Sequence, residues 1–182
     1  KEVEELVRKL REHVRDIKRK LEELLKENED HARRAEDRLR ELTKENRDHV
    51  KEMEDVLRRD TDSRETIRKL LEDHKRLSKE TAERIEELIR DHERLSRETS
   101  KRIKELIDDH RRLLEEAAKD IRDKDTLERL EREVRKSIKE LEDKLREIRK
   151  RNKEVIDKLR DILEKIKKEN REALKRLRDT EE

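Results

Sequence analysis

Residues 26–50 read KENEDHARRAEDRLRELTKENRDHV, and this stretch contains one hexapeptide pattern twice. KENEDH at residues 26–31 recurs as KENRDH at residues 44–49, an interval of 18 residues. Eighteen residues make about five turns of an α-helix at about 3.6 residues per turn, so residues at this interval lie on the same side of a helix. The stretch therefore predicts a long helix whose buried face repeats every five turns.

The apolar residues of this segment form one seam from Val3 to Leu57, in steps that alternate mainly between four and three residues. A heptad repeat has a shorter period, about 3.5, and supercoils to the left, whereas five layers in 18 residues predict straight helices. One apolar stripe per helix is typical of a helix that faces the core of a bundle. Since almost every Leu, Ile and Val lies in such a seam, we expect an all-α, straight, monomeric three-helix bundle.

Two interruptions of the seam indicate where the helices begin and end. Asp62 with Glu65, and Asp125 with Glu128, have the spacing of an N-cap residue and an acidic residue at N3. These signals predict the starts of the second and third helices.

The short connections between helices require neighbouring helices to run antiparallel, in up-down-up order. Because the chain contains no glycine, we expect Asp60 and Lys124 to take left-handed or irregular conformations at the helix ends. The sequence predicts a single domain over residues 1–182, with helices at about 1–59, 62–122 and 125–180.

The six histidines form two trios, and each trio has the same 18-residue interval. Their residue numbers also add in pairs to a constant, as expected for residues at matching heights on two antiparallel helices. We therefore expect three histidine pairs, buried and stacked along the bundle. The predicted pairs are His13 with His110, His31 with His92, and His49 with His74.

Polar residues of the seams line up in the same way, because their residue numbers also add to constants between antiparallel helices. Two similar polar layers are predicted around the second and third histidine pairs. Around the pair of His13 and His110, Leu and Val stand where the other layers have Asn and Ser, and Ser137 is expected beside this pair instead. The predicted partners of the histidines are Asn28, Asn46, Thr43, Ser78, Thr81, Ser96, Thr99, Ser137, Asn152 and Asn170.

Two interpretations of these groups remain open. They could only fix the register of the helices, because a buried polar group left unpaired costs roughly 1–3 kcal/mol. They could also make stability depend on pH, since burial beside a second histidine lowers the pKa of each below about 6.5. The unfolded chain would then bind more protons, so protonation below about pH 6 destabilises the fold.

The composition argues against other function classes. The chain is 60% charged and contains no Gly, Cys or aromatic residue of the Phe, Tyr or Trp type, so we expect neither catalysis nor a cofactor. The net charge of +2 comes from interleaved signs, unlike the basic patch that binds nucleic acid. No apolar run reaches the roughly 18 residues of a membrane span. We expect a soluble chain, cytoplasmic on recombinant expression, with no required partner, nucleic acid or membrane.

Metal binding is the rival hypothesis from another class, because two facing imidazoles are potential zinc ligands. A structural zinc site needs four ligands, however, and the aspartates that precede the histidines by one residue point about 100° away on a helix. We therefore predict no metal site, and keep a bis-histidine metal-binding bundle as an alternative.

The straight 18-residue period, the Lys, Glu and Arg surface, the absence of Gly and the Asn, Ser, Thr and His layers together resemble de novo designed parametric helical bundles. In particular, the chain resembles three-helix bundles with buried histidine hydrogen-bond networks that are made to respond to pH. The resemblance covers the whole chain. It implies a protein without a natural function, used as a conformational switch or, by self-association, as the subunit of a pH-responsive filament.

Overall fold

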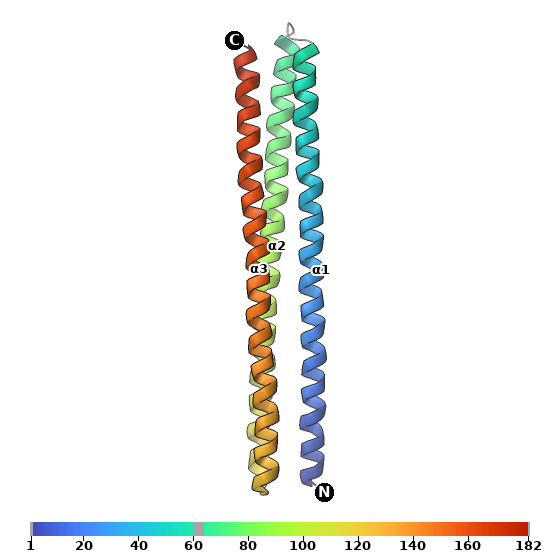
Figure 1. The fold of residues 1–182 in the computed structure, drawn as a ribbon, viewed down its shortest axis with the longest axis vertical. Helices are drawn as coiled ribbons and strands as arrows, with labels where there is room; N and C mark the ends of the chain where they lie inside the picture. Colours follow the sequence, from blue (N-terminus) through green and yellow to red (C-terminus); the bar gives the residue numbers. More distant parts are fainter. Residues whose placement is uncertain (1, 60–63, 182) are drawn as a thin grey trace. The chain divides into compact units, whose positions relative to one another are not determined.

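The computed structural model describes residues 2–59 and 64–181, which form three long helices: α1 (Glu2–Arg59), α2 (Arg64–Asp120) and α3 (Lys124–Glu181) (Figure 1). No strand occurs in these ranges, so the predicted all-α fold with three helices is confirmed. The chain divides into two compact units, each with a segment of every helix. Unit 1 comprises Lys1–Asp30 and Arg94–Lys153, and unit 2 comprises His31–Glu93 and Glu154–Glu182.

The start of α3 differs from the prediction. The carboxylate of Asp123 accepts a hydrogen bond from the Asp125 backbone N–H at 3.3 Å and another from the Thr126 hydroxyl at 2.6 Å. Asp123 is therefore the N-cap residue, and Asp125 lies in the first helical turn. The prediction that Asp125 caps the helix is wrong, because two aspartates stand two residues apart and the earlier one reaches the free N–H groups.

The connection between α2 and α3 also needs no left-handed residue. The described residues contain no positive φ angle, and Lys124 is helical, so the expectation for Lys124 is wrong. α2 ends at Asp120, two residues before the predicted end, and Ile121 is turned into the core with 4% of its surface exposed. The expectations for Asp60 and for an N-cap at Asp62 fall outside the described residues.

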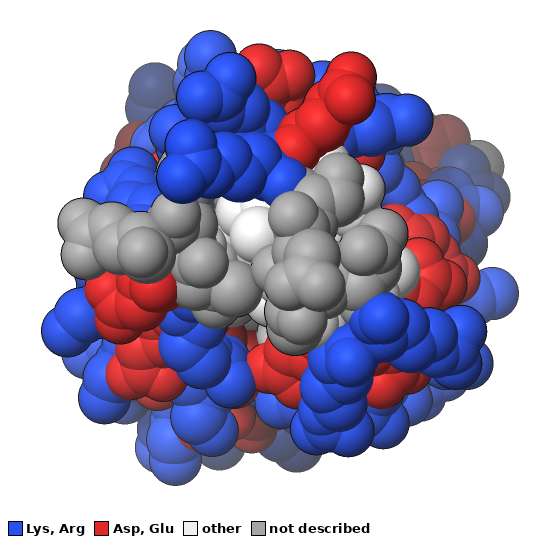
Figure 2. Space-filling model, turned by 90° about the horizontal axis from the view of Figure 1, so that it is seen from above, with Lys and Arg blue, Asp and Glu red and all other residues white. Residues whose placement is uncertain are grey.

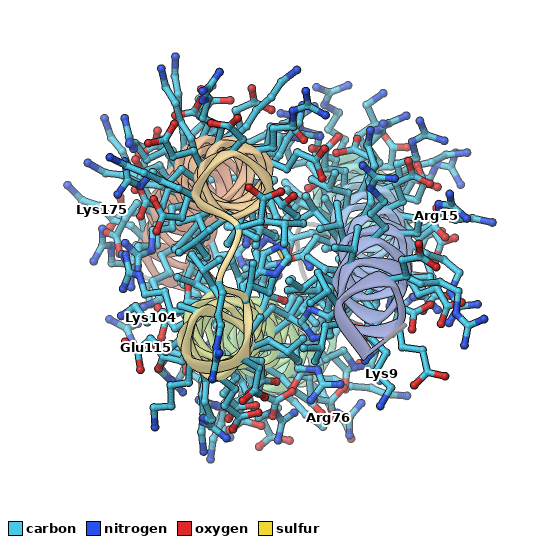
Figure 3. All side chains as sticks on the ribbon, turned by 90° about the horizontal axis from the view of Figure 1, so that it is seen from below. Lys9, Arg15, Arg76, Lys104, Glu115 and Lys175 are labelled. Carbon is cyan, nitrogen blue, oxygen red and sulfur yellow. The ribbon has the colours of Figure 1, made fainter. Side chains whose placement is uncertain are left out.

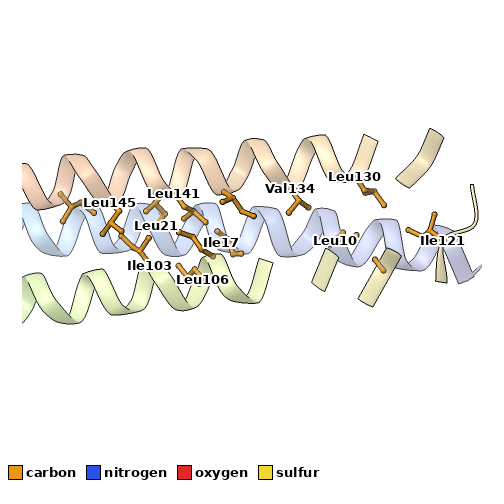
Figure 4. Close-up of a cluster of buried hydrophobic side chains, with 14 residues drawn as sticks. Leu10, Ile17, Leu21, Ile103, Leu106, Ile121, Leu130, Val134, Leu141 and Leu145 are labelled. Atoms are coloured by element: carbon orange, nitrogen blue, oxygen red, sulfur yellow. The ribbon is translucent and has the colours of Figure 1, made fainter. Parts of the chain in front are cut away.

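The core of unit 1 is one apolar cluster to which all three helices contribute (Figure 4). Leu10 and Ile17 come from α1, Ile103 from α2, and Leu130 and Leu141 from α3, each at most 2% exposed. Early residues of α1 lie beside late residues of α2 within this unit, which is the antiparallel order that the short connection requires.

The core of unit 2 consists of two apolar clusters. One contains Leu39, Ile85 and Leu159, and the other contains Met53 and Leu177. Both units also contain buried polar side chains, and these form the candidate site described below.

The surface is charged, with both signs interleaved (Figure 2). Charged side chains such as Lys9, Arg76 and Glu115 extend away from the helices into solvent (Figure 3). None of the large apolar side chains that the structure describes is exposed. Over residues 2–59 and 64–181, no helix has an apolar stretch of the length needed to cross a membrane.

Candidate functional site: histidine pairs and buried amides

In unit 1, α1 and α2 bring His13 and His110 together as predicted. Their Nδ1 atoms are 3.2 Å apart, a hydrogen-bond distance, and their ring planes are inclined by 56°. One Nδ1 must therefore donate a proton and the other must accept it, because a neutral imidazole has one donor and one acceptor nitrogen.

Unit 2 contains the other two predicted pairs. The Nδ1 atoms of His31 and His92 are 2.9 Å apart, and those of His49 and His74 are 3.3 Å apart. The rings of His49 and His74 are nearly parallel, at 6°, and their centroids are 5.4 Å apart. The distance between the centroids is close to the distance between the two Nδ1 atoms plus the radii of the two rings. It is too long for face-to-face stacking of the rings. The two rings therefore meet end to end, with their Nδ1 atoms between them.

Burial is unequal within each pair. His74, His92 and His110 of α2 are completely buried, at 0% exposure, whereas their α1 partners are only partly buried. The expectation that all six histidines are buried therefore holds for the three on α2 alone.

The position of each histidine around its helix explains this difference. On α1, the centre of the buried face is marked by Leu10, Asn28 and Asn46. Each histidine comes three residues after one of these, so its side chain points about 60° away from that centre. On α2, the histidines themselves lie at the centre of the buried face, close to the direction of residues such as Thr81 and Ile85.

The pair in unit 1 also has a hydroxyl partner. His110 Nε2 lies 2.8 Å from Ser137 Oγ, as predicted for this serine. In unit 2, the residue 36 positions after Ser137 is Ala173, and the histidine 36 positions before His110 is His74. Nε2 of His74 is buried and has no hydrogen-bond partner that meets distance and angle criteria. The substitution of alanine for serine at the matching position accounts for this difference.

Two buried amides of unit 2 pair with each other. Asn46 Nδ2 donates to Asn170 Oδ1 at 2.9 Å, and Asn170 Nδ2 donates to Asn46 Oδ1 at 3.0 Å. These reciprocal hydrogen bonds join α1 to α3 and satisfy one donor and one acceptor of each amide. The structure thus confirms that the two residues lie at one level.

The corresponding amides of unit 1 make a different arrangement. Asn152 Nδ2 donates to Asn28 Oδ1 at 3.1 Å, while Asn28 Nδ2 donates to Thr99 Oγ1 and to the Leu24 carbonyl, both at 2.8 Å. Thr99 therefore links α2 to the amide pair. Asn152 Oδ1 is left without a partner because Asn28 directs its amide protons elsewhere.

Several predicted partners take no part in these contacts. The Thr43 hydroxyl donates to the carbonyl of Leu39, one turn earlier on its own helix, at 2.7 Å. Ser78, Thr81 and Ser96 have no side-chain hydrogen bond among the described residues. Among the described residues of unit 2, no side-chain hydrogen bond joins the pair of His49 and His74 to the amide pair, although the backbone of Asn170 interacts with His74.

Burial lowers the pKa of two of the α2 histidines, His74 and His110. The pKa of His110 is lowered to about 4, mainly by desolvation and to a smaller extent by the charge of His13. Desolvation also lowers the pKa of His74, with a second contribution from His49, while the backbone of Asn170 opposes the shift.

The α1 histidine of unit 1 has charged neighbours as well. Desolvation lowers the pKa of His13, Asp109 and Asp16 raise it, and Lys20 lowers it. Asp109 acts on His13 although it is adjacent in sequence to His110, because side chains of neighbouring helical residues point in different directions. Sequence reasoning did not identify Asp16, whose only signal is its position three residues after His13.

The chemistry of this arrangement is proton binding at paired nitrogens. No group of three or more His, Asp or Glu side chains is placed to hold a metal ion within the described ranges. The fold and the site together define a three-helix bundle with buried histidine pairs and amide pairs.

The comparisons with known proteins agree with this class of fold. The chain is similar to a solved structure described as a computationally designed three helix bundle, with a TM-score of 0.53, 16% sequence identity, and coverage of 99% of this chain and 89% of that chain. No protein-family model matches the sequence, and no curated protein matches it.

Proposed function

We propose that the chain is a designed structural protein, a single three-helix-bundle domain whose buried polar pairs set the helix register and couple its stability to pH. The observation that carries the proposal is the end-to-end contact of two Nδ1 atoms in each histidine pair, at 2.9 to 3.3 Å. The likeness of the fold to a computationally designed bundle supports the designed origin. The proposal includes no catalytic step.

The proton content of a pair determines whether its contact is attractive. In the neutral pair, one Nδ1–H donates to the other Nδ1. A first added proton leaves this hydrogen bond in place and makes it charge-assisted, because the pair still has one free Nδ1 acceptor. A second proton makes both Nδ1 atoms donors, so two N–H groups face each other and the hydrogen bond is lost.

The second proton also introduces repulsion. The ring centroids of the pairs are 5.1 to 5.4 Å apart. Two unit charges at about 5 Å repel each other by about 3 kcal/mol at an effective dielectric constant of about 20. Complete protonation therefore favours separation of α1 from α2 at each pair.

In the pair of unit 1, His13 takes the first proton under this proposal, because it is partly exposed and His110 is fully buried. The charge of His13 lowers the pKa of His110, and the charge of His49 lowers the pKa of His74, which agrees with this order. The second proton then has to enter the buried α2 ring, and its entry is the destabilising step.

The sign of the pH dependence follows from these shifts. A histidine whose pKa is lowered by folding is neutral in both states above about pH 6.5, so its burial has no protonation cost there. As the pH falls from about 6.5 toward the folded pKa, the unfolded chain binds the proton first and stability is lost. For His110 this window extends down to about pH 4.

The experiment is urea denaturation followed by circular dichroism from pH 8 to pH 4, on the parent and on a variant with all six histidines replaced by Asn. We expect the parent to lose several kcal/mol below about pH 6.5, and the variant to lose much less. Equal losses in both proteins, or a flat curve for the parent, would show that the histidines only fix the register.

A further inference from the structure

A groove lies between α1 and α3 on the surface of unit 2, with a volume of about 450 Å³. Its apolar lining consists of Leu39 on α1 with Ile162 and Ile166 on α3. Thr43 also lines the groove, and its hydroxyl is already bonded to the Leu39 carbonyl. Of the three apolar residues, only Ile162 is partly exposed, while Leu39 and Ile166 lie beneath the groove with 2% of their surface exposed.

The rim of this groove is mainly cationic. Six basic residues and three acidic residues line it, whereas the whole chain has nearly equal numbers of each sign. Five of the six cations form no ion pair or side-chain hydrogen bond with any residue that the structure describes. These five are Lys44, Arg47, Lys51, Lys158 and Lys165.

The same surface one repeat earlier, in unit 1, provides an internal comparison. There the hollow between α1 and α3 has a volume of only about 160 Å³, and Arg151 on α3 forms an ion pair with Glu29 on α1 at 3.3 Å. Arg47 and Glu169 occupy the matching positions in unit 2 with the signs exchanged, and no ion pair between them is formed. The larger groove is therefore the one that lacks this bridge.

The charge on the rim is also reversed between the repeats. Four basic residues of the groove, at positions 40, 47, 158 and 165, correspond to glutamates at positions 22, 29, 140 and 147. The cationic rim is thus particular to unit 2, although the helical repeat that carries it is shared. Figure 2 shows that signs are mixed elsewhere on the visible surface.

From the apolar lining and the unpaired cationic rim, we propose that this groove binds a single-chain anionic amphiphile, such as a fatty-acid carboxylate. The alkyl chain lies over the partly exposed Ile162, above Leu39 and Ile166, and the anionic head group contacts the rim cations. The volume lies within the roughly 300–1,000 Å³ typical of small-molecule sites. A protein partner would instead require roughly 1,000 Å² or more of complementary interface, which the narrow apolar lining does not supply.

The test is calorimetric titration with sodium myristate below its micellar concentration at pH 8. We compare the parent with Lys158→Glu/Lys165→Glu, which installs the residues of the preceding repeat. The matched control is Lys101→Glu/Lys104→Glu, which changes the net charge equally at exposed positions on α2. We expect one myristate per parent chain, unchanged binding by the control, and binding at least about tenfold weaker in the groove variant.

A second ligand separates charge recognition from simple apolar adsorption. Tetradecyltrimethylammonium has a tail of similar length and the opposite charge, so we expect it to bind the parent more weakly than myristate does. The proposal is overturned if both ligands bind the parent equally, if both double variants weaken binding equally, or if an acidic peptide binds the groove and myristate does not. None of these results depends on the titration of the histidines, so this inference and the pH-dependent function can fail separately.

Discussion

The rings of His49 and His74 meet end to end, with Nδ1 atoms 3.3 Å apart and ring planes 6° apart. In the neutral pair, one Nδ1 carries a proton and donates it in a hydrogen bond to the Nδ1 of the other ring. Burial of the α2 ring then makes additional protons costly, because the charged form loses its hydration. Under the proposed function, proton binding and helix contact are coupled at this pair of atoms.

His110 should contribute a large, separable part of the acid sensitivity. Its pKa falls from 6.5 to about 4 on folding, and each unit corresponds to about 1.4 kcal/mol. We expect His110→Asn to reduce the loss of stability between pH 7.5 and pH 4 by about 3 kcal/mol, measured by urea denaturation. Lys104→Asn, at an exposed position on the same helix, is the control and should leave the loss unchanged. Identical losses in the parent and His110→Asn would contradict this assignment.

The two histidines of one pair should titrate as a coupled system. His13→Gln removes the charge that lowers the pKa of His110, so we expect the pKa of His110 to rise above about 4. It should remain below 6.5, because desolvation is the larger cause of the shift. Nuclear magnetic resonance of the imidazole protons measures both values. His31→Gln, a change in another pair, serves as the control, and an equal shift of His110 in that variant would refute the local coupling.

Ser137 should stabilise unit 1 through its contact with His110 Nε2 at 2.8 Å. Ser137→Ala leaves this buried nitrogen without a partner, so we expect a loss of about 1–3 kcal/mol at pH 7.5 in urea denaturation. Ser100→Ala is the control because the Ser100 hydroxyl contacts Arg149 at the exposed surface, where a change within about 0.5 kcal/mol is expected. A loss no larger than that of the control would mean that the hydroxyl contact makes no net contribution to the free energy of unfolding.

The reverse substitution can be made in unit 2, where Ala173 occupies the position that matches Ser137. Ala173→Ser should supply an acceptor for the Nε2–H of His74 and thereby favour its charged form. We expect the pKa of His74 to rise, as followed by nuclear magnetic resonance. An unchanged titration of His74 would show that the repeat equivalence does not extend to this contact.

The sequence allowed the fold and the histidine pairs to be predicted, because residue spacing determines helix direction and helix pairing. The unequal burial within pairs was also accessible in principle, since His13 stands three residues after the buried Leu10. The absence of side-chain hydrogen bonds between the histidine pair and the amide pair of unit 2 could not be predicted from the sequence. Thr43 and Ser78 are in the expected places, but whether a hydroxyl bonds to another helix depends on side-chain rotation and sub-ångström distances.

The amide pair should be more important for specificity than for net stability. Asn46→Ala or Asn170→Ala leaves one buried amide without its reciprocal partner, so we expect each to lose about 1–3 kcal/mol in urea denaturation. Replacement of both by Leu removes both polar groups and should be neutral or stabilising, because apolar packing then replaces a desolvated pair. A double variant that loses as much as the two single variants combined would instead assign a net stabilising role to the hydrogen bonds.

The N-cap of α3 provides a direct comparison between two nearby aspartates. Asp123 accepts hydrogen bonds from the Asp125 N–H and the Thr126 hydroxyl, whereas Asp125 contributes only its charge in the first turn. Loss of a capping side chain costs about 1 kcal/mol, and loss of a first-turn charge costs about 0.3–1 kcal/mol. In urea denaturation we therefore expect Asp123→Ala to destabilise the protein more than Asp125→Ala, and Asp123→Asn to restore most of the loss, since its amide oxygen can still accept. The opposite order of the two alanine variants would place the cap at Asp125, where the spacing to Glu128 first indicated it.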